Sequence, residues 1–343
     1  MGAFLFMKPL LLTLILAAIC TPQTARAIPF PSSQNSTAEN PLTSSEVSAI
    51  RAKAEAGDPV AENAIGVMYR IGRGVAKDKE EAVHWYRKAA KHGNSAAMFN
   101  LGAAYYNGDG VAIDDVMSCA WFLLAEEAGY SEADAAVRRA ASENSARITE
   151  ASAKVAEMYE SGNELPKDEF NALRWYRKAA DGGAPEAAVK VAGMLLDGRN
   201  PSQAEYMEAR KRCQDAADRQ YSPGAYGMAI IYQRGLGVAK DPTEAAKWLI
   251  RAADLGHPKA MLQLAEAYWR GDGVKADLVA AYMWVWLAYN SNVPGSDRDE
   301  EALRKEMGQK DIGRAKKKAD EWARQHGSLV LLRRSPGGTP PQQ

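Results

Sequence analysis

The apolar positions between residues 58 and 292 recur at helical spacing, in pairs of stretches joined by a short turn that contains glycine. Tyr69, Trp85 and Ala89 fall on the faces that two such helices would turn inward. Small residues such as Gly66 stand where the two helices would approach closely. We expect the first helix of a pair to run for about 14 residues before a Gly-x-Gly turn reverses the chain. The pattern therefore predicts an all-α chain built from antiparallel helix pairs.

The same unit returns along the chain at a spacing of 36 residues, as from Tyr69 to Tyr105. A longer gap separates Tyr105 from Tyr159, so an extra stretch follows the second unit. Six units result. The fourth has Arg212 in place of the tryptophan, and we expect it to be the softest joint of the array. The first recurring set is Gly66, Tyr69, Gly72, Gly74, Asp78, Trp85, Ala89 and Gly93, which returns as Gly102, Tyr105, Gly108, Gly110, Asp114, Trp121, Ala125 and Gly129.

Residues suited to a first helical turn mark the helix starts. Asp78 with Glu81, and Asp241 with Glu244, have the spacing of a capping box, in which each side chain bonds the backbone N–H of the other residue. A proline is harmless at the first helical position, because the N–H that it lacks would have no partner there. Pro59, Pro185, Pro223 and Pro258 occupy that position in four of the units.

One helix pair cannot bury its own apolar face, so the units are expected to stack into an α-solenoid. The composition, 46% hydrophobic and 25% charged, is that of a folded chain. Cys119 and Cys213 lie two units apart, too far to pair, and we interpret them as buried free thiols. Packing rather than disulfide bonds must therefore stabilise this protein.

The repeat resembles the Sel-one-like repeat, a relative of the tetratricopeptide repeat, over about residues 58–292. The resemblance implies a right-handed superhelix and a role in assembling proteins. The expected fold is an all-α, right-handed α-solenoid of six helix-turn-helix repeats, with an extra helix after repeat two and C-terminal capping helices. Unit four and Glu164, which replaces a turn glycine, depart from the family pattern. The resemblance rests on Leu101, Gly102, Tyr105, Gly108, Asp109, Gly110, Val111, Asp114, Ala120, Trp121 and Ala125 to Gly129, with their equivalents.

The domain boundaries follow from this pattern. Residues 46–292 are expected to form the solenoid, and residues 293–326 the capping helices. Residues 28–45 are expected to be a flexible leader, because they carry too little apolar surface to offset the entropy lost on ordering. Residues 327–343, rich in proline and glycine, are interpreted as a tail of the same kind.

Residues 1–27 have the pattern of an export signal. Lys8 supplies a positive charge, an apolar run extends from Leu10 to Ile19, and Ala25-Arg26-Ala27 matches a signal-peptidase site. The apolar run is too short to span a bilayer comfortably. We expect cleavage after Ala27 and a periplasmic or secreted protein. An uncleaved anchor, or lipidation at Cys20, is the alternative.

The charge balance argues against two classes of partner. Lysine plus arginine and aspartate plus glutamate each number 43, so no strong field attracts nucleic acid or an anionic membrane. Lys316-Lys317-Lys318, flanked by Asp311 and Asp320, is interpreted as a solvated helix face. We therefore expect a protein or peptide partner, no nucleic-acid partner, and no membrane span in the mature chain.

Metal and phosphate sites are not predicted. The histidines His84, His92, His257 and His326 form no metal-ligand motif, so neither a metal nor a cofactor is expected. The Gly-x-Gly turns join helix to helix, whereas a phosphate loop follows a strand. The segment 270–272 spells the adhesion tripeptide Arg-Gly-Asp, yet it falls within one of these repeat turns and is interpreted as a coincidence.

The resemblance also raises the possibility of catalysis, because some relatives in the family have been linked to penicillin binding and β-lactam hydrolysis. The motifs S-x-x-K and G-x-S-x-G are both absent from the chain. We therefore predict no catalytic residues and interpret the chain as a protein other than an enzyme. A cell-wall or β-lactam hydrolase, or a penicillin-binding protein, is the alternative.

The candidate functional surface is the concave face of the solenoid. In tetratricopeptide relatives, first-helix side chains that are not used for packing line this face, and exposed aromatics there are typical of peptide binding. The alternative for Phe99 and Leu262 is packing against adjacent units. We predict an exported interaction scaffold or regulator that binds a protein or peptide segment there. The positions selected are Asn63, Val67, Arg70, Phe99, Ala103, Tyr106, Glu157, Glu160, Tyr226, Ile230, Gln233, Leu262, Glu266 and Trp269.

Overall fold

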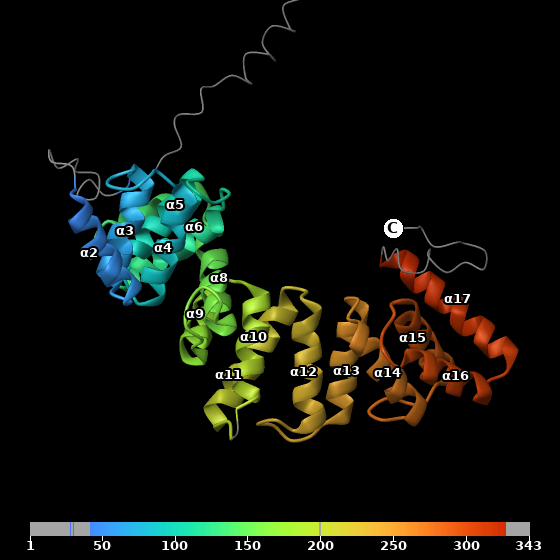
Figure 1. Ribbon diagram of the computed structural model, residues 1–343. Coiled ribbons are helices and arrows are strands. Elements are labelled where there is room, and N and C mark those ends of the chain that lie inside the picture. Colours follow the sequence, from blue (N-terminus) through green and yellow to red (C-terminus); the bar gives the residue numbers. More distant parts are fainter. Residues whose placement is uncertain (1–27, 29, 31–41, 199, 327–343) are drawn as a thin grey trace, which may run out of the picture. The chain divides into compact units, whose positions relative to one another are not determined.

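The computed structural model describes residues 28, 30, 42–198 and 200–326, and the regular secondary structure in these ranges is helical throughout (Figure 1). The chain divides into two compact units, Met1–Glu169 and Phe170–Gln343. The predicted signal peptide and the predicted tail lie outside the described residues. Within the described ranges, no helix has both the length and the apolar content needed to cross a bilayer.

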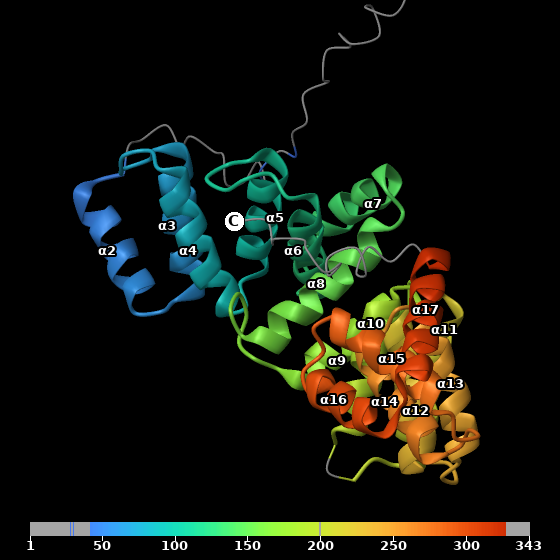
Figure 2. The same ribbon diagram turned by 90° about the vertical axis from the view of Figure 1, so that its right-hand side faces the viewer.

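The first unit consists of helix pairs followed by two further helices. Helix α3 packs on α4 and α5 on α6, while α4 also contacts α5 (Figure 2). Helices α7 and α8 both pack on α6, so the predicted extra helix after repeat two is present. The bounds are α2 Ser44–Glu55, α3 Pro59–Ile71, α4 Lys79–Lys91, α5 Ser95–Asn107, α6 Asp115–Glu127, α7 Ala133–Glu143 and α8 Arg147–Ser161.

The second unit has the same kind of organisation. Helix α10 packs on α11, α12 on α13 and α14 on α15, and contacts between α11 and α12 and between α13 and α14 join the pairs. Helices α16 and α17 both pack on α15, as the predicted capping helices should. The bounds are α9 Glu169–Asp181, α10 Pro185–Leu196, α11 Gln203–Asp218, α12 Ser222–Arg234, α13 Pro242–Asp254, α14 Pro258–Arg270, α15 Leu278–Asn290, α16 Ser296–Glu306 and α17 Gln309–Gln325.

Five consecutive helices of the first unit correspond one to one with five consecutive helices of the second. Helix α3 starts at Pro59 and α12 at Ser222, an offset of 222 − 59 = 163 residues. The same offset relates α4 to α13, α5 to α14, α6 to α15 and α7 to α16. The extra helix after repeat two and the first capping helix are therefore equivalent parts of two copies of one arrangement.

Glycines allow the closest helix approaches, as the pattern predicted. A Cβ atom on Gly66 would lie 2.7 Å from the ring of Tyr86, and one on Gly102 would lie 2.5 Å from the ring of Phe122. Real Cβ contacts are longer than this, so a larger residue would push the paired helices apart. The tight pairing of α3 with α4 and of α5 with α6 thus depends on these two glycines.

In two of the turns, the second glycine has a role beyond reversing the chain. Gly110 has a φ of 75°, and a Cβ there would lie 2.1 Å from the carbonyl oxygen of Lys79, at the start of α4. Its equivalent, Gly273, would place a Cβ 2.0 Å from the carbonyl oxygen of Pro242. These two turns therefore lie directly against the backbone of the preceding repeat, and only glycine fits both the conformation and the space.

In the predicted capping boxes, the hydrogen bonds accepted by the aspartates are present, whereas the reciprocal bonds to the glutamates are not. The Asp78 side chain accepts from the backbone N–H of Glu81, but the Glu81 carboxylate accepts from the indole of Trp85 at 2.9 Å. Asp241 likewise caps α13 through the N–H groups of residues 243 and 244. Reciprocal capping boxes occur instead at the starts of α2 and α11, at Thr43 with Glu46 and at Ser202 with Glu205.

The repeat tryptophans are core residues, as expected. Trp121 is fully buried and Trp248 is half-buried against its unit's core. Cys119 and Cys213 are buried free thiols, which confirms that interpretation. Burial also raises the pKa of the Cys213 thiol to about 12, so this thiol is a poor nucleophile at neutral pH. The repeat tryptophans that are less than a tenth exposed are Trp85, Trp121, Trp175 and Trp284.

The fourth predicted unit is a helix pair, α10 and α11, despite its missing tryptophan. Arg212 stands in the tryptophan position with its side chain 13% exposed. Its guanidinium lies 2.6 Å from the Asp181 carboxylate and 3.5 Å from that of Glu208. Ion pairs here replace an aromatic contact. The boundary between the two compact units falls one repeat earlier along the chain, between residues 169 and 170. The lower stability expected for unit four stays a prediction.

Candidate functional site

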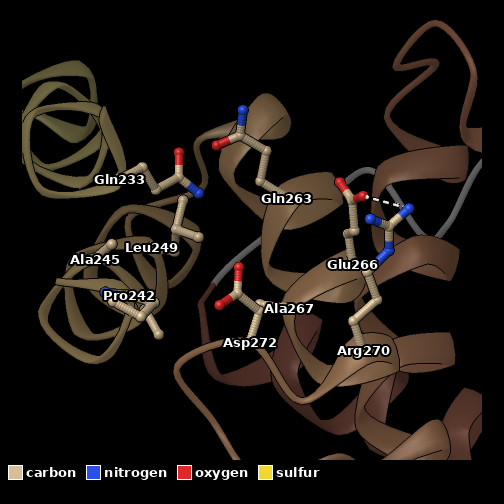
Figure 3. Close-up of a pocket in the computed structure, with 10 residues that line it drawn as sticks. Gln233, Pro242, Ala245, Leu249, Gln263, Glu266, Ala267, Arg270 and Asp272 are labelled. Atoms are coloured by element: carbon tan, nitrogen blue, oxygen red, sulfur yellow. Dashed lines mark ion pairs between the residues drawn. The ribbon is translucent and has the colours of Figure 1, made fainter. Parts of the chain in front are cut away.

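A pocket of about 270 Å³ opens in the second unit between α12, α13 and α14 (Figure 3). Its floor is apolar, because Leu249, Ala245 and Ala246 of α13 are buried beneath it. Polar side chains surround the floor. The residues lining the pocket are Gln233, Pro242, Ala245, Ala246, Leu249, Gln263, Glu266, Ala267, Arg270 and Asp272.

Helical spacing explains why α14 supplies much of the rim. Gln263, Glu266 and Arg270 are three and four residues apart, so they share one face of the helix. Figure 3 shows Gln233 of α12 on the other side of the opening, with Leu249 of α13 between the two helices. The pocket is thus a consequence of stacking one helix pair on the next.

The Gln263 amide is only partly satisfied. Its Nε2 donates to the hydroxyl of Tyr226 at 3.0 Å, but its Oε1 is buried and has no hydrogen-bond partner. A buried acceptor without a donor costs about 1–3 kcal/mol, so native proteins leave few of them. The pocket is therefore lined by an amide whose hydrogen-bonding capacity is not fully used in this structure.

The charged pair at the rim is weakly held. Arg270 lies 3.1 Å from Glu266, and their side chains are 72% and 55% exposed. Exposed pairs of this kind contribute little to stability and are screened by salt. Both groups can accordingly re-pair with a ligand at small cost.

The pocket brings together only part of the predicted surface of this unit. Gln233 and Glu266 line it, whereas Tyr226, Leu262 and Trp269 are half-buried and pack against the unit's core. The Trp269 indole also donates to Glu306 at 3.0 Å. Leu262 therefore packs against neighbouring helices, as the alternative interpretation predicts. Ile230 is half-buried and lies outside the pocket lining.

The sequence reasoning missed three polar residues of the pocket. Gln263 is adjacent to Leu262, which was selected in its place, and Arg270 and Asp272 were assigned to the repeat turn alone. A signal was present, since Arg270 lies four residues after the selected Glu266 on the same helix face. The Arg-Gly-Asp turn thus does contribute to the site, through its two charged side chains.

The expectation of exposed aromatics in the first unit is wrong for Phe99 and Tyr106. Both are buried. The Phe99 ring lies 5.1 Å from that of Phe122 and 5.0 Å from that of Tyr130. The Tyr106 hydroxyl donates to Glu143 at 3.1 Å. The extra helix α7 and the turn before it cover this face, so both aromatics serve packing.

The other selected positions of the first unit are polar or small. Asn63 is half-buried and accepts a hydrogen bond from the fully buried Asn100 at 2.9 Å. Glu157 is exposed and pairs with Lys154 at 3.1 Å. Val67, Arg70 and Glu160 are half-buried, and Ala103 is buried.

Two positions of the first unit that are equivalent to pocket residues contact Ile28 and Phe30 of the leader. The 163-residue offset matches Gln233 with Arg70 and Arg270 with Asn107. Asn107 contacts Ile28 at both its backbone N–H and its carbonyl group, at 3.1 and 3.0 Å. The Arg70 guanidinium lies 3.8 Å from the centre of the Phe30 ring. The leader was expected to be flexible throughout, yet Ile28 and Phe30 are each only 7% exposed.

The histidines have structural contacts. His92 lies 2.7 Å from the Glu62 carboxylate, and His257 accepts the Ala260 N–H at the start of α14. Burial lowers the pKa of His257 to about 4, with Lys259 adding to the effect. Within the described ranges, no three side chains of the metal-ligating types come together.

A comparison with protein families decides the family. The Sel1 repeat model matches residues 59–94, 95–130, 149–183, 222–257 and 258–291, which together make up half of the chain. The chain belongs to the Sel1 repeat family. The matched stretches coincide with helix pairs of the structure, such as α3–α4 and α14–α15. The fourth predicted unit, α10–α11, lies outside these five stretches.

Similar proteins place the repeats in different settings. Chitin synthase regulatory factor 3 of Schizosaccharomyces pombe is 32% identical over 123 residues, which are 34% of this Sel1 repeat chain and 13% of that protein. A protective antigen of uropathogenic Escherichia coli strains with an SLR fold is 21% identical, with 88% of this chain and 84% of that one covered and a TM-score of 0.51, which shows a shared fold. A Sel1 repeat protein from Oxalobacter formigenes is 26% identical, over 68% of this chain and 85% of that one, with a TM-score of 0.39.

Proposed function

We propose that this Sel1 repeat chain is an exported scaffold or regulator, which binds a segment of a partner protein in the pocket between α12, α13 and α14. The observation that carries the proposal is the buried Gln263 Oε1, an acceptor without a donor in the wall of a pocket that has an apolar floor and a polar rim. A peptide backbone supplies the N–H that this oxygen lacks. No catalytic role belongs to the proposal.

The rim chemistry fits a peptide better than a small apolar ligand. Gln233, Glu266 and Arg270 offer donors and acceptors on both sides of the opening, while Leu249 offers an apolar contact below. Peptide recognition combines these features, because the backbone groups of a bound peptide need hydrogen bonds and its apolar side chains need apolar pockets. A regulatory role is suggested by the name of the fission yeast relative, and export by the pattern of residues 1–27.

The test is a selection of random seven-residue peptides on the chain from Ile28 to Gln343, which contains every described residue. Enriched peptides should bind the Gln263→Leu variant at least tenfold more weakly, because leucine has no acceptor for the peptide N–H. The matched control is Gln325→Leu, an exposed glutamine at the end of α17. Circular dichroism should show equal helical content in all three proteins.

Two outcomes would contradict the proposal. Either no peptide is enriched, or the enriched peptides bind the unchanged chain and the Gln263→Leu variant equally well. Arg270→Ala supplies an independent check, because it removes a rim charge that is 72% exposed and contributes little to folding.

A further inference from the structure

Residues of the leader are bound on the first unit as a ligand would be. Ile28 and Phe30 lie outside the helices and are buried to the same degree as many core residues. They belong to a stretch whose sequence predicts no structure of its own. Their burial must therefore come from a complementary surface on the helices.

The side-chain amide of Asn107 forms hydrogen bonds with a peptide backbone at this surface. The Asn107 Oδ1 accepts from the Ile28 N–H at 3.1 Å, and its Nδ2 donates to the Ile28 carbonyl oxygen at 3.0 Å. Both bonds go to backbone atoms, so they fix the path of a peptide without selecting its side chains. Asn107 is the last residue of α5, and the left-handed Gly108 follows it.

Arg70 supplies the selective contact. Its guanidinium lies 3.8 Å from the centre of the Phe30 ring, within the range of a cation–π interaction. Arg70 is half-buried and also faces the buried hydroxyl of Tyr86. A partly desolvated guanidinium held in this way favours an aromatic ring two residues after the residue that Asn107 holds.

We propose that the surface of Asn107 and Arg70 is a binding site for a peptide with an apolar residue followed two positions later by an aromatic residue, and that Ile28 and Phe30 of this chain occupy it intramolecularly. This inference rests on the proposed peptide-binding function and extends it to the first unit. A partner segment of the same chemistry must displace the leader, which therefore competes for the site.

The second unit identifies which contacts are specific to this site. The position of Arg70 is taken there by Gln233, and that of Asn107 by Arg270. Neither replacement keeps the pair of functions seen in the first unit, an amide for the backbone and a cation for the ring. The two sites therefore select different segments, although the helices that form them correspond.

The experiment measures binding in trans of a fluorescent, N-terminally acetylated peptide with the sequence of residues 28–34, Ile-Pro-Phe-Pro-Ser-Ser-Gln, in which the Ile28 nitrogen is an amide N–H as in the structure. The protein is the chain from Ile28 to Gln343, either unchanged or with Phe30→Ala. Phe30→Ala weakens the binding of the intramolecular occupant, so this chain should bind the peptide at least tenfold more tightly than the unchanged chain. A peptide with alanine in place of its phenylalanine should bind neither.

Variants of the amide locate the binding. In the Phe30→Ala chain, Asn107→Ala should abolish peptide binding. Asn107→Asp should weaken it, because the carboxylate still accepts from the N–H but cannot donate to the carbonyl oxygen. Asn200→Ala, at an exposed asparagine in the second unit, is the matched control and should have no effect.

Docking of the leader can also be followed directly, without a variant of Phe30. The ring resonances of isotopically labelled Phe30 in the unchanged chain should move to their free positions when an excess of the peptide is added. Ring resonances that stay in place, equal peptide affinity with and without Phe30→Ala, or binding that survives Asn107→Ala would each overturn the inference. Selected peptides that depend on Gln263 would in that case still support the pocket of the second unit.

Discussion

Asn100 and Gln263 occupy equivalent positions in the two units, and each has a side-chain carbonyl oxygen that is buried without a hydrogen-bond partner. Each also uses its amide nitrogen in the same way, to bond the preceding first helix at Asn63 or at Tyr226. The 37-residue step of these bonds links one repeat to the next. One polar position thus links neighbouring repeats in both units and leaves a buried acceptor without a donor in each.

Gly110→Ala should destabilise the first unit strongly. The new Cβ would meet the Lys79 carbonyl oxygen at 2.1 Å, and the positive φ adds strain, so we expect a loss of about 3–5 kcal/mol. Gly129→Ala is the matched control, because it has a similar φ of 80° but no atom within 4 Å of the added Cβ, and it should cost about 1–2 kcal/mol. Urea unfolding followed by circular dichroism gives both values, and equal losses would refute the backbone contact.

The stability of the second unit should fall as the pH is lowered from about 6.5 to about 4. His257 has an ordinary pKa of 6.5 when unfolded and about 4 in the folded chain, because burial disfavours its charged form. Protons therefore bind the unfolded state first, and the contribution of neutral His257 is complete above pH 6.5. Melting temperatures measured between pH 4 and pH 8 test this directly.

His257→Asn supplies the control for that experiment. Asn94, at the equivalent position of the first unit, caps α5 by accepting the Ala97 N–H, so asparagine should preserve the cap on α14. The variant should melt at the same temperature as the unchanged chain at pH 8 and should lose less stability on acidification. An unchanged pH profile would show that other groups cause the acid sensitivity.

Phe99→Ala should unfold or loosen the first unit rather than remove a binding residue. Phe99 is 4% exposed and packs on two rings, so its loss should cost about 3–5 kcal/mol. Arg70→Ala, on the neighbouring first helix, should leave the helical content intact. Thermal melts of both variants decide the matter, and a stable Phe99→Ala protein would return this residue to the candidate surface.

Cleavage after Ala27 should leave Ile28 at the N-terminus of the exported chain. N-terminal sequencing of the protein from periplasm and medium would give Ile-Pro-Phe as the first residues. Ala27→Leu should accumulate the precursor, since the processing enzyme requires a small residue there. A mature N-terminus at any other position would contradict the assignment.

Amide hydrogen exchange should be faster in α11 than in α13. The Arg212 side chain in α11 makes ion pairs where the other units bury a tryptophan, and such pairs hold a joint less firmly than an aromatic side chain. Uniform protection across both helices would contradict the softness predicted for this unit.

The repeat residues predicted the helices, their starts and their core. Trp121 and Gly102 could be placed from the sequence because each serves a contact within its own helix pair, and such contacts recur with the repeat. The covering of Phe99 and Tyr106 by α7 could not be predicted in this way, because a helix inserted once breaks the rule that first helices keep an open face. The 36-residue spacing also hid the 163-residue duplication, which includes these inserted helices.

The binding surfaces were the least predictable part. Ile28 and Asn107 are 79 residues apart, and neither belongs to the repeat pattern, so nothing in the spacing connects them. Gln263 lies on the same helix as residues predicted to bind, but it is a candidate only because its Oε1 is buried without a hydrogen-bond partner. The sequence does not show this. Such features arise from the packed structure rather than from the period of the sequence.

Gly110 packs against main-chain atoms of Lys79, which belongs to the preceding repeat. Main-chain atoms are the same whichever amino acid occupies position 79, so no replacement there can make room for a side chain at position 110. A lineage that lost this glycine could recover the fit only by reverting or by reshaping the turn. At Gly110 and at Gly273, a second substitution in the preceding repeat therefore cannot compensate for the loss of the glycine, as it can between packed side chains.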